Sequence, residues 1–110
     1  MLRIVMMTGL VLAASGSAWA QDAKTAAGEK VYVDQKCSVC HSIAGKGNQK
    51  GALDDVGSKL TSDEIRMWIT DAKGMTAKTK ATRKPPMREY NLPKDQLDAL
   101  VGYLATLKKK

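Results

Sequence analysis

The stretch VDQKCSVCHSIAGKG, residues 33–47, decides how this chain folds. It contains Cys37, Cys40 and His41, which are the only two cysteines and the only histidine among the 110 residues. All thiol and imidazole groups of the chain therefore fall within five consecutive positions. Because soft and borderline metals prefer these ligands, we expect the three residues to share one chemical task.

Two tasks known for such residues lack the context that they need. A structural zinc site takes four ligands, and no further Cys or His completes the set, although Asp or Glu is a possible fourth ligand. A redox-active C-x-x-C pair usually follows a strand of a βαβ unit, and no segment shows the alternation of a strand. A disulfide between Cys37 and Cys40 would close a very short loop and constrain little of the unfolded chain.

The remaining task is covalent haem attachment, for which C-x-x-C-H is the motif. Cys37 and Cys40 lie about one helical turn apart, so both sulfurs can add to vinyl groups on one edge of a porphyrin. His41 follows directly and can lie beneath the ring, where it gives the iron a nitrogen ligand. We therefore predict one covalently attached haem c, with Cys37 and Cys40 as the thioether residues and His41 as an axial iron ligand.

The sixth position of the iron is either vacant or filled by a methionine or a lysine, since no second histidine exists. Met67 lies beside Trp68 in a predicted helix, where methionine usually serves packing. Met75 follows Gly74 in a predicted loop and stays a candidate. Met87 follows RKPP, whose prolines fix the backbone, and this stiff approach favours Met87 as the ligand.

Residues 1–20 have the pattern of a cleaved secretory signal. Arg3 provides a positive charge, residues 4–14 are mostly apolar, and the triplet AWA ends at Ala20. The apolar run is shorter than the roughly 20 residues of a membrane-spanning helix, so we expect no permanent membrane anchor. We predict cleavage after Ala20, export to the periplasm, and a single domain over residues 21–110.

The pattern of apolar residues predicts an all-α fold. The predicted helices cover residues 24–35, 61–72 and 92–110. The middle one opens with a capping box formed by Thr61 and Glu64. Residues 72–90 show no period and contain two adjacent prolines, so we expect a long ordered loop there, and the glycine-rich residues 45–51 predict a second loop. Three to four helices would then wrap around the haem.

Several motifs together resemble the small class I cytochromes c of bacteria across residues 21–110. CSVCH matches their haem-binding pentapeptide, and KPPM resembles the stretch that supplies the axial methionine. Gly28 and Tyr32 resemble the Gly-x-x-x-aromatic pair of the first helix. LVGYLATLK resembles the last helix, with Leu100 and Tyr103 in matching positions. The resemblance implies a cytochrome c fold whose first and last helices cross near Gly28.

The resemblance also implies three haem contacts, at Leu53, Trp68 and Pro86. Trp68 either donates its indole N–H to a haem propionate or anchors the middle helix in the core. Relatives commonly have Gly-Pro-x-Leu after the haem motif, and the proline carbonyl accepts a hydrogen bond from the proximal histidine. Here residues 51–53 read Gly-Ala-Leu. We expect the Ala52 carbonyl to keep the bond to His41, without the stiffness of proline.

The implied function is electron transfer by a soluble periplasmic carrier, not an enzyme, because two protein ligands leave the iron no open site. Methionine ligation raises the reduction potential. The net charge of +7 predicts acidic surfaces on redox partner proteins, in transient complexes of a monomer, and export argues against nucleic acid. Two alternatives stay open: a haem subunit of a periplasmic oxidoreductase complex, and a ligand-binding haem protein with an open iron site.

Overall fold

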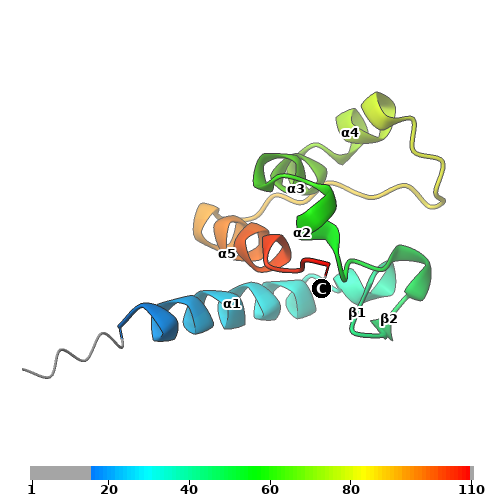
Figure 1. Ribbon diagram of the computed structural model, residues 1–110. Helices are drawn as coiled ribbons and strands as arrows, with labels where there is room; N and C mark the ends of the chain where they lie inside the picture. The colour runs from blue at the N-terminus through cyan, green and yellow to red at the C-terminus, as the bar shows by residue number, and fades with distance from the viewer. Residues whose placement is uncertain (1–15, 110) are drawn as a thin grey trace, which may run out of the picture.

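The computed structural model describes residues 16–109 and is mostly helical, as predicted (Figure 1). The predicted signal segment lies largely outside the described residues. In chain order the elements are α1 (Gly16–Asp34), η1 (Cys37–Val39), β1 (Ser42–Ile43), β2 (Lys46–Gly47), η2 (Gln49–Gly51), α2 (Val56–Lys59), α3 (Ser62–Thr70), α4 (Ala72–Thr79) and α5 (Lys94–Ala105). The antiparallel pair β1–β2 was not predicted, because two residues per strand are too few to show alternation.

The first and last helices pack against each other along much of their length, and Gly28 allows their close approach (Figure 1). A Cβ atom at Gly28 would fall on the backbone of Ala99 and on the Cβ of Tyr103. One turn further along α1, Tyr32 meets Tyr103 edge to face, with ring centroids 6.3 Å apart. The expected crossing near Gly28 is therefore confirmed.

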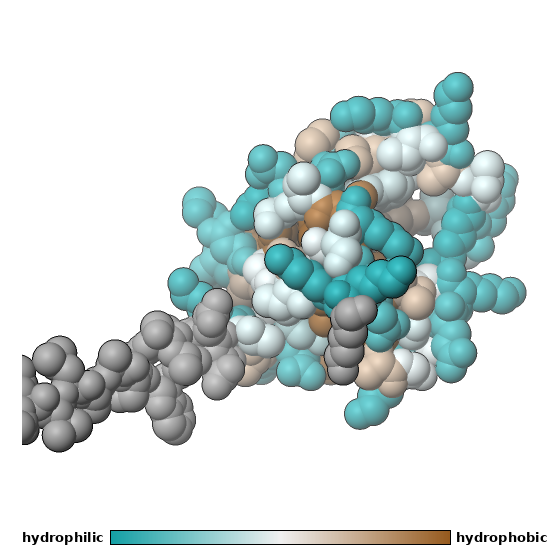
Figure 2. Space-filling model, in the orientation of Figure 1, coloured by the Kyte–Doolittle hydropathy of each residue, from teal (hydrophilic) through white to brown (hydrophobic). Residues whose placement is uncertain are grey.

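Helices α1, α3 and α5 supply one hydrophobic core. The buried residues of this core are Val31, Tyr32, Ile65, Ile69, Leu100, Val101, Tyr103 and Leu104. On the face shown in Figure 2, hydrophobic residues (brown) appear in recesses between hydrophilic ones (teal). Because so few side chains form the core of a domain this small, it gains only modest stability from its own burial.

Helix α3 begins as predicted, at a capping box. The Glu64 backbone N–H donates to Thr61 Oγ1 at 3.2 Å, and the Thr61 N–H donates to Glu64 Oε1 at 3.0 Å. Hydrogen bonding of the Glu64 carboxyl to the Thr61 backbone, and to a smaller extent to the Thr61 side chain, holds the pKa of that carboxyl below its usual value. The reciprocal bonds satisfy two backbone donors that have no partner inside the helix.

The prediction of a loop over residues 72–90 is wrong for its first part, which forms α4. Asp71 caps this helix by accepting a hydrogen bond from the Gly74 N–H at 3.2 Å. Its buried residues are Ala72 and Met75. Two buried apolar positions are too few to produce a visible period. The helix therefore forms because it packs against α3, and its own sequence pattern does not predict it.

The last predicted helix is too long at its C-terminal end. Pro93 is the N-cap residue, and α5 ends at Ala105, where Thr106 caps it by donating its hydroxyl to the Tyr103 carbonyl at 2.6 Å. Lys108 and Lys109 therefore lie beyond the helix. Instead of extending it, the Lys109 N–H donates to Ser58 Oγ at 2.7 Å and ties the chain end to α2.

Candidate functional site

The haem motif belongs to what we call the attachment segment, residues 37–52, whose first turn is tightly hydrogen-bonded. Lys36 has a left-handed backbone conformation, with φ 57°, and reverses the chain at the end of α1. The Cys37 carbonyl then accepts the N–H of Cys40 at 3.1 Å and of His41 at 2.9 Å. These two bonds fix the motif residues relative to one another.

The two thiols differ in environment. Cys37 is partly buried and packs against the core, whereas Cys40 is exposed, and neither is in a disulfide. Burial raises the pKa of the Cys37 thiol, and the nearby Arg88 charge lowers it to a smaller extent. The segment thus presents two free thiols one turn apart, one at the edge of the core and one in solvent.

The His41 ring is oriented by a backbone carbonyl. Nδ1 lies 2.9 Å from the Gly51 carbonyl oxygen, so Nδ1 is the donor and Nε2 is the nitrogen able to bind a metal. Burial is the main cause that holds the pKa of His41 below its usual value; the bond to Gly51 opposes this, and the charge of Arg83 adds to it. A neutral imidazole is the form that coordinates metals.

The acceptor of this bond was predicted one residue too late, at Ala52. In the structure Ala52 pairs with Ser42 in a parallel bridge, and the next N–H, that of Leu53, donates to the Ser42 carbonyl at 2.8 Å. This pairing sets the direction of the chain and turns the Gly51 carbonyl toward the histidine ring. The bond survives the absence of proline because any residue supplies a carbonyl.

Asn48 closes the attachment segment, and its role was missed from the sequence. Its N–H lies 2.9 Å from the His41 carbonyl and 3.1 Å from the Ser38 carbonyl, and its Nδ2 donates to the Val39 carbonyl at 3.2 Å. The preceding Gly47 has φ 110°, and a Cβ atom there would fall on the His41 carbonyl. An asparagine inside a glycine-rich loop is a known signal for such backbone bonding.

The three candidate methionines have different surroundings. Met67 is 41% exposed on α3, and Met75 is 3% exposed in α4 without belonging to the main core. Met87 is partly buried and packs against the main core. Met87 is therefore the one of the three that lies on an irregular segment beside the core, as a ligand approaching from a loop requires.

Met87 lies on what we call the methionine segment, residues 81–93, which has few bonds to the rest of the protein. The Tyr90 N–H donates to the Ile69 carbonyl at 2.9 Å, and Glu89 accepts the Lys73 N–H at 3.3 Å. The Arg88 guanidinium lies 5.0 Å from the centre of the Tyr90 ring. Arg83, taken from the sequence as a surface cation, donates from Nη2 to the Cys40 carbonyl.

The predicted haem contacts lie in three different environments. Leu53 is partly buried against the core, and Pro86 is exposed on the methionine segment. Trp68 is partly exposed and belongs neither to the core nor to the side chains packed against it. The structure therefore gives no support to the alternative in which Trp68 anchors the middle helix in the core.

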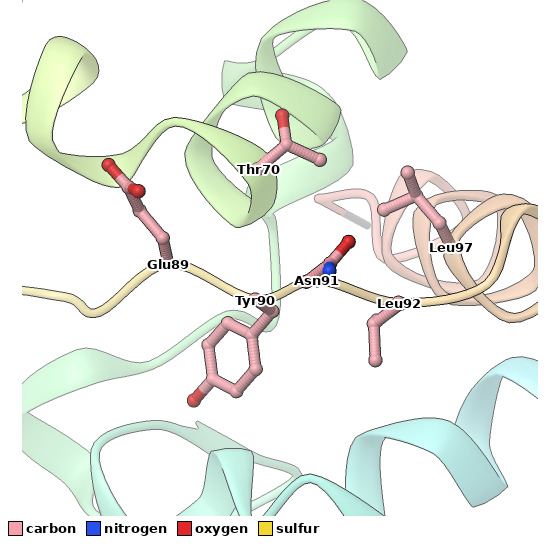
Figure 3. Close-up of a pocket in the computed structure, with 6 residues that line it drawn as sticks. All are labelled: Thr70, Glu89, Tyr90, Asn91, Leu92 and Leu97. Carbon is pink, nitrogen blue, oxygen red and sulfur yellow. The ribbon is translucent and has the colours of Figure 1, made fainter.

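An open pocket of about 410 Å³ is lined partly by the methionine segment, and Figure 3 shows its lining residues. The lining residues are Thr70, Glu89, Tyr90, Asn91, Leu92 and Leu97. In this view Glu89 points toward the helices above, while the Tyr90 ring points away, toward the ribbons below. The lining contains no residue of the haem motif and no methionine, so the predicted chemistry lies elsewhere.

Residues 16–109 contain neither a membrane-spanning helix nor a ready-made cluster of metal ligands. No helix in this range is both long and apolar enough to cross a membrane. Within the same range, no group of three or more His, Cys, Asp and Glu side chains gathers closely enough to hold a metal ion.

Comparison with known proteins identifies the family. A family model described as "Cytochrome c" matches residues 25–108, which is most of the chain. No curated protein and no solved structure gives a match. The matched region contains every residue of the attachment and methionine segments.

Cytochromes c carry covalently bound haem c with its iron, and the residues of this site fit that group. Cys37 and Cys40 are free thiols at the motif spacing. His41 has its Nδ1 engaged and its Nε2 left to coordinate. Apolar side chains of Leu53 and Met87 lie against the core nearby. The site thus offers two thiols that would form the thioether bonds to a haem and an oriented imidazole that would bind its iron.

Proposed function

This chain belongs to the cytochrome c family, and from that premise we propose that it is a soluble periplasmic electron carrier with His41 and Met87 as axial iron ligands. The family consists generally of electron carriers. The observation that carries the proposal is the orientation of His41, whose Nδ1 is bound 2.9 Å from the Gly51 carbonyl. A ring held in this way keeps its position when the charge on a metal changes.

When bound, the haem supplies one-electron chemistry between Fe(III) and Fe(II). Cys37 and Cys40 hold it to the chain through thioether bonds. Met87 would give the iron a thioether ligand, which would raise the reduction potential. With both axial positions filled by side chains, the chain excludes substrate from the iron, and it is therefore not an enzyme.

Export is part of the proposal and rests on residues 1–20. Their charge, apolar run and AWA triplet have the pattern of a cleaved signal, which places the cut after Ala20. The remaining residues, 21–110, form one domain.

Six cations on the two segments and beside them suit acidic partner surfaces. All are exposed, and none takes part in the ion pairs found among the described residues: Lys36, Lys46, Lys50, Arg83, Lys84 and Arg88. Unpaired surface charge steers association and is screened by salt. We expect fast, transient complexes of a monomer with redox partner proteins, weakening as the salt concentration rises.

A stable subunit of an oxidoreductase complex is the second candidate, and one observation favours it. Val39 lies inside the haem motif and is 66% exposed. An apolar side chain at this place would suit a permanent interface. Salt-insensitive association with a co-purifying partner would support the subunit, whereas salt-sensitive binding supports the free carrier.

The test is the absorption spectrum of the purified protein, oxidised and reduced, for the wild type and for Met87→Leu. The wild type should show a sharp c-type α band on reduction and a weak near-infrared band from sulfur-to-iron charge transfer on oxidation. Met87→Leu should keep the covalent haem and lose the near-infrared band. Met67→Leu is the matched control, since Met67 is 41% exposed, and it should keep both bands.

A near-infrared band that survives in Met87→Leu would transfer the ligand role to Met75. Covalent haem without this band in the wild type would indicate a lysine ligand or an open iron site. Absence of haem, in a host able to attach it, would refute the proposal altogether.

A further inference from the structure

We propose that Arg83 is a positioning residue that ties the methionine segment to the haem motif and so holds Met87 toward the iron. This role rests on the proposed ligation by Met87. It is carried by the hydrogen bond from Arg83 Nη2 to the Cys40 carbonyl, which joins residues 43 positions apart in sequence. Among the described residues, this is the one hydrogen bond that links the two segments directly.

Gly51 provides the space for this contact. A Cβ atom at Gly51 would meet the Arg83 guanidinium and the Cys40 carbonyl oxygen. The Gly51 carbonyl also accepts the hydrogen bond from His41 Nδ1. Arg83 therefore packs against the backbone that orients the imidazole, and it bonds to the residue directly before that imidazole in sequence.

The chain between Arg83 and Met87 is short and stiff. Only Lys84, Pro85 and Pro86 separate the two residues, so their Cα atoms are at most about 14 Å apart. The two prolines have fixed φ angles, which limits how far Met87 can move while Arg83 stays bound. A bond at Arg83 thus restricts the position of the methionine sulfur, although Arg83 itself need not touch the haem.

The guanidinium suits this task better than an ammonium group. Its planar fork presents several donors at once, so it can bond to a carbonyl while it lies flat against the glycine backbone. It is exposed to solvent, which weakens the bond. We therefore expect a measurable but moderate hold on the methionine segment, one that a competing ligand can overcome.

The experiment measures how tightly imidazole, added as a competing ligand, displaces Met87 from the ferric protein with haem attached. Displacement is followed by loss of the near-infrared sulfur-to-iron band. Arg83→Ala should bind imidazole roughly three- to tenfold more tightly than the wild type, because a charged but exposed hydrogen bond is lost. Lys84→Ala is the matched control: it removes an equal charge from the adjacent position, and its affinity should stay close to that of the wild type.

Urea unfolding of the same variants separates positioning from general destabilisation. The equilibrium constant for unfolding should rise in Arg83→Ala by no more than the roughly three- to tenfold factor seen in imidazole binding, because the same exposed bond to Cys40 is lost on unfolding, and Lys84→Ala should stay close to the wild type. Equal imidazole affinities of the two variants would overturn the proposal, as would an Arg83→Ala loss of unfolding stability much larger than its change in imidazole binding, which would indicate general destabilisation.

Imidazole binding to Met87→Leu distinguishes failure of the Arg83 proposal from failure of the proposed ligation by Met87. If Met87→Leu and the wild type bind imidazole alike, Met87 is not the ligand, and both the ligation and the role of Arg83 are refuted. If Met87→Leu changes the affinity and Arg83→Ala does not, the ligation stands and the role of Arg83 alone is refuted.

Discussion

The attachment segment is hydrogen-bonded mainly to itself, whereas the methionine segment is held by isolated bonds to distant parts of the chain. Within residues 37–52, Asn48 and Gly51 reach back to the His41 region over seven to ten positions. Within residues 81–93, the bonds from Arg83, Glu89 and Tyr90 span much longer separations and stand apart from one another.

This difference shows which axial ligand is the more firmly placed. Bonds that share residues form and break together, so the attachment segment resists local opening. Separate, solvent-exposed bonds belong to the part of a protein that opens at low cost in free energy. We therefore expect the methionine side of the site to release first under denaturant or competing ligand, and the histidine side to persist until the protein unfolds.

The largest expected effect is that of His41→Ala. The substitution removes the only imidazole of the chain, so stable low-spin iron coordination should be lost completely. The reduced absorption spectrum checks this, with Met87→Leu as the comparison, because that variant should keep histidine ligation. A normal spectrum from His41→Ala would show that the attachment segment does not ligate the iron.

Gly47→Ala should have the second-largest effect, because it disrupts the hydrogen-bonded loop of the attachment segment. The backbone φ of 110° strains any side chain, and the new Cβ would fall on the His41 carbonyl. We expect the free energy of unfolding to fall by about 3 kcal/mol, measured with urea. Gly45→Ala is the control in the same loop: φ is 78° with nothing within 4 Å of the new Cβ, so the loss should be only about 1 kcal/mol.

Tyr32→Phe should stabilise the protein. The Tyr32 hydroxyl is the buried side-chain polar atom without a partner among the described residues, and its removal should add about 1 kcal/mol to the free energy of unfolding at neutral pH. Tyr90→Phe, whose ring is only partly buried, should bring no such gain. Equal urea midpoints for wild type and Tyr32→Phe would show that the hydroxyl finds a partner in the haem-bound protein.

The advantage of Tyr32→Phe should grow in alkaline solution. Burial is the main cause that raises the pKa of Tyr32 from 10.0 to about 12, with smaller contributions from Cys37, Tyr103 and Asp54. Between these values the unfolded chain ionises the phenol and the folded protein does not, so wild-type stability contributed by Tyr32 falls as the pH rises. Urea midpoints at neutral pH and near pH 11 would reveal the widening difference.

Glu89→Gln should have the smallest effect, because it weakens one isolated bond of the methionine segment. The Glu89 carboxylate accepts the Lys73 N–H in the first turn of α4 at 3.3 Å, in solvent. Loss of the negative charge at this helix N-terminus should cost about 0.5 kcal/mol. A cost comparable to that of Gly47→Ala would contradict the contrast between the two segments.

Features encoded by neighbouring residues could be predicted from the sequence, and features made by distant contacts could not. Thr61 and Glu64 lie three positions apart and form their capping box without help from the rest of the fold. The two apolar residues of α4 give no period, so this helix depends on packing against α3. The hydrogen bond from Arg83 to the Cys40 carbonyl joins residues 43 positions apart, and no local sequence pattern predicts it.

Because a backbone carbonyl orients His41, amino-acid substitutions affect this bond differently from a bond made by a side chain. Gly51 contributes a backbone atom to the bond, and every amino acid carries the same atom. Mutation of the codon at this position, or at Ala52, therefore cannot delete the acceptor; it can only shift the loop that presents it. This chain has Ala52 and no proline after Gly51, and the histidine ring still has its carbonyl partner. The histidine side of the site is thus protected against sequence drift, whereas the methionine side depends on side chains that a single mutation can remove.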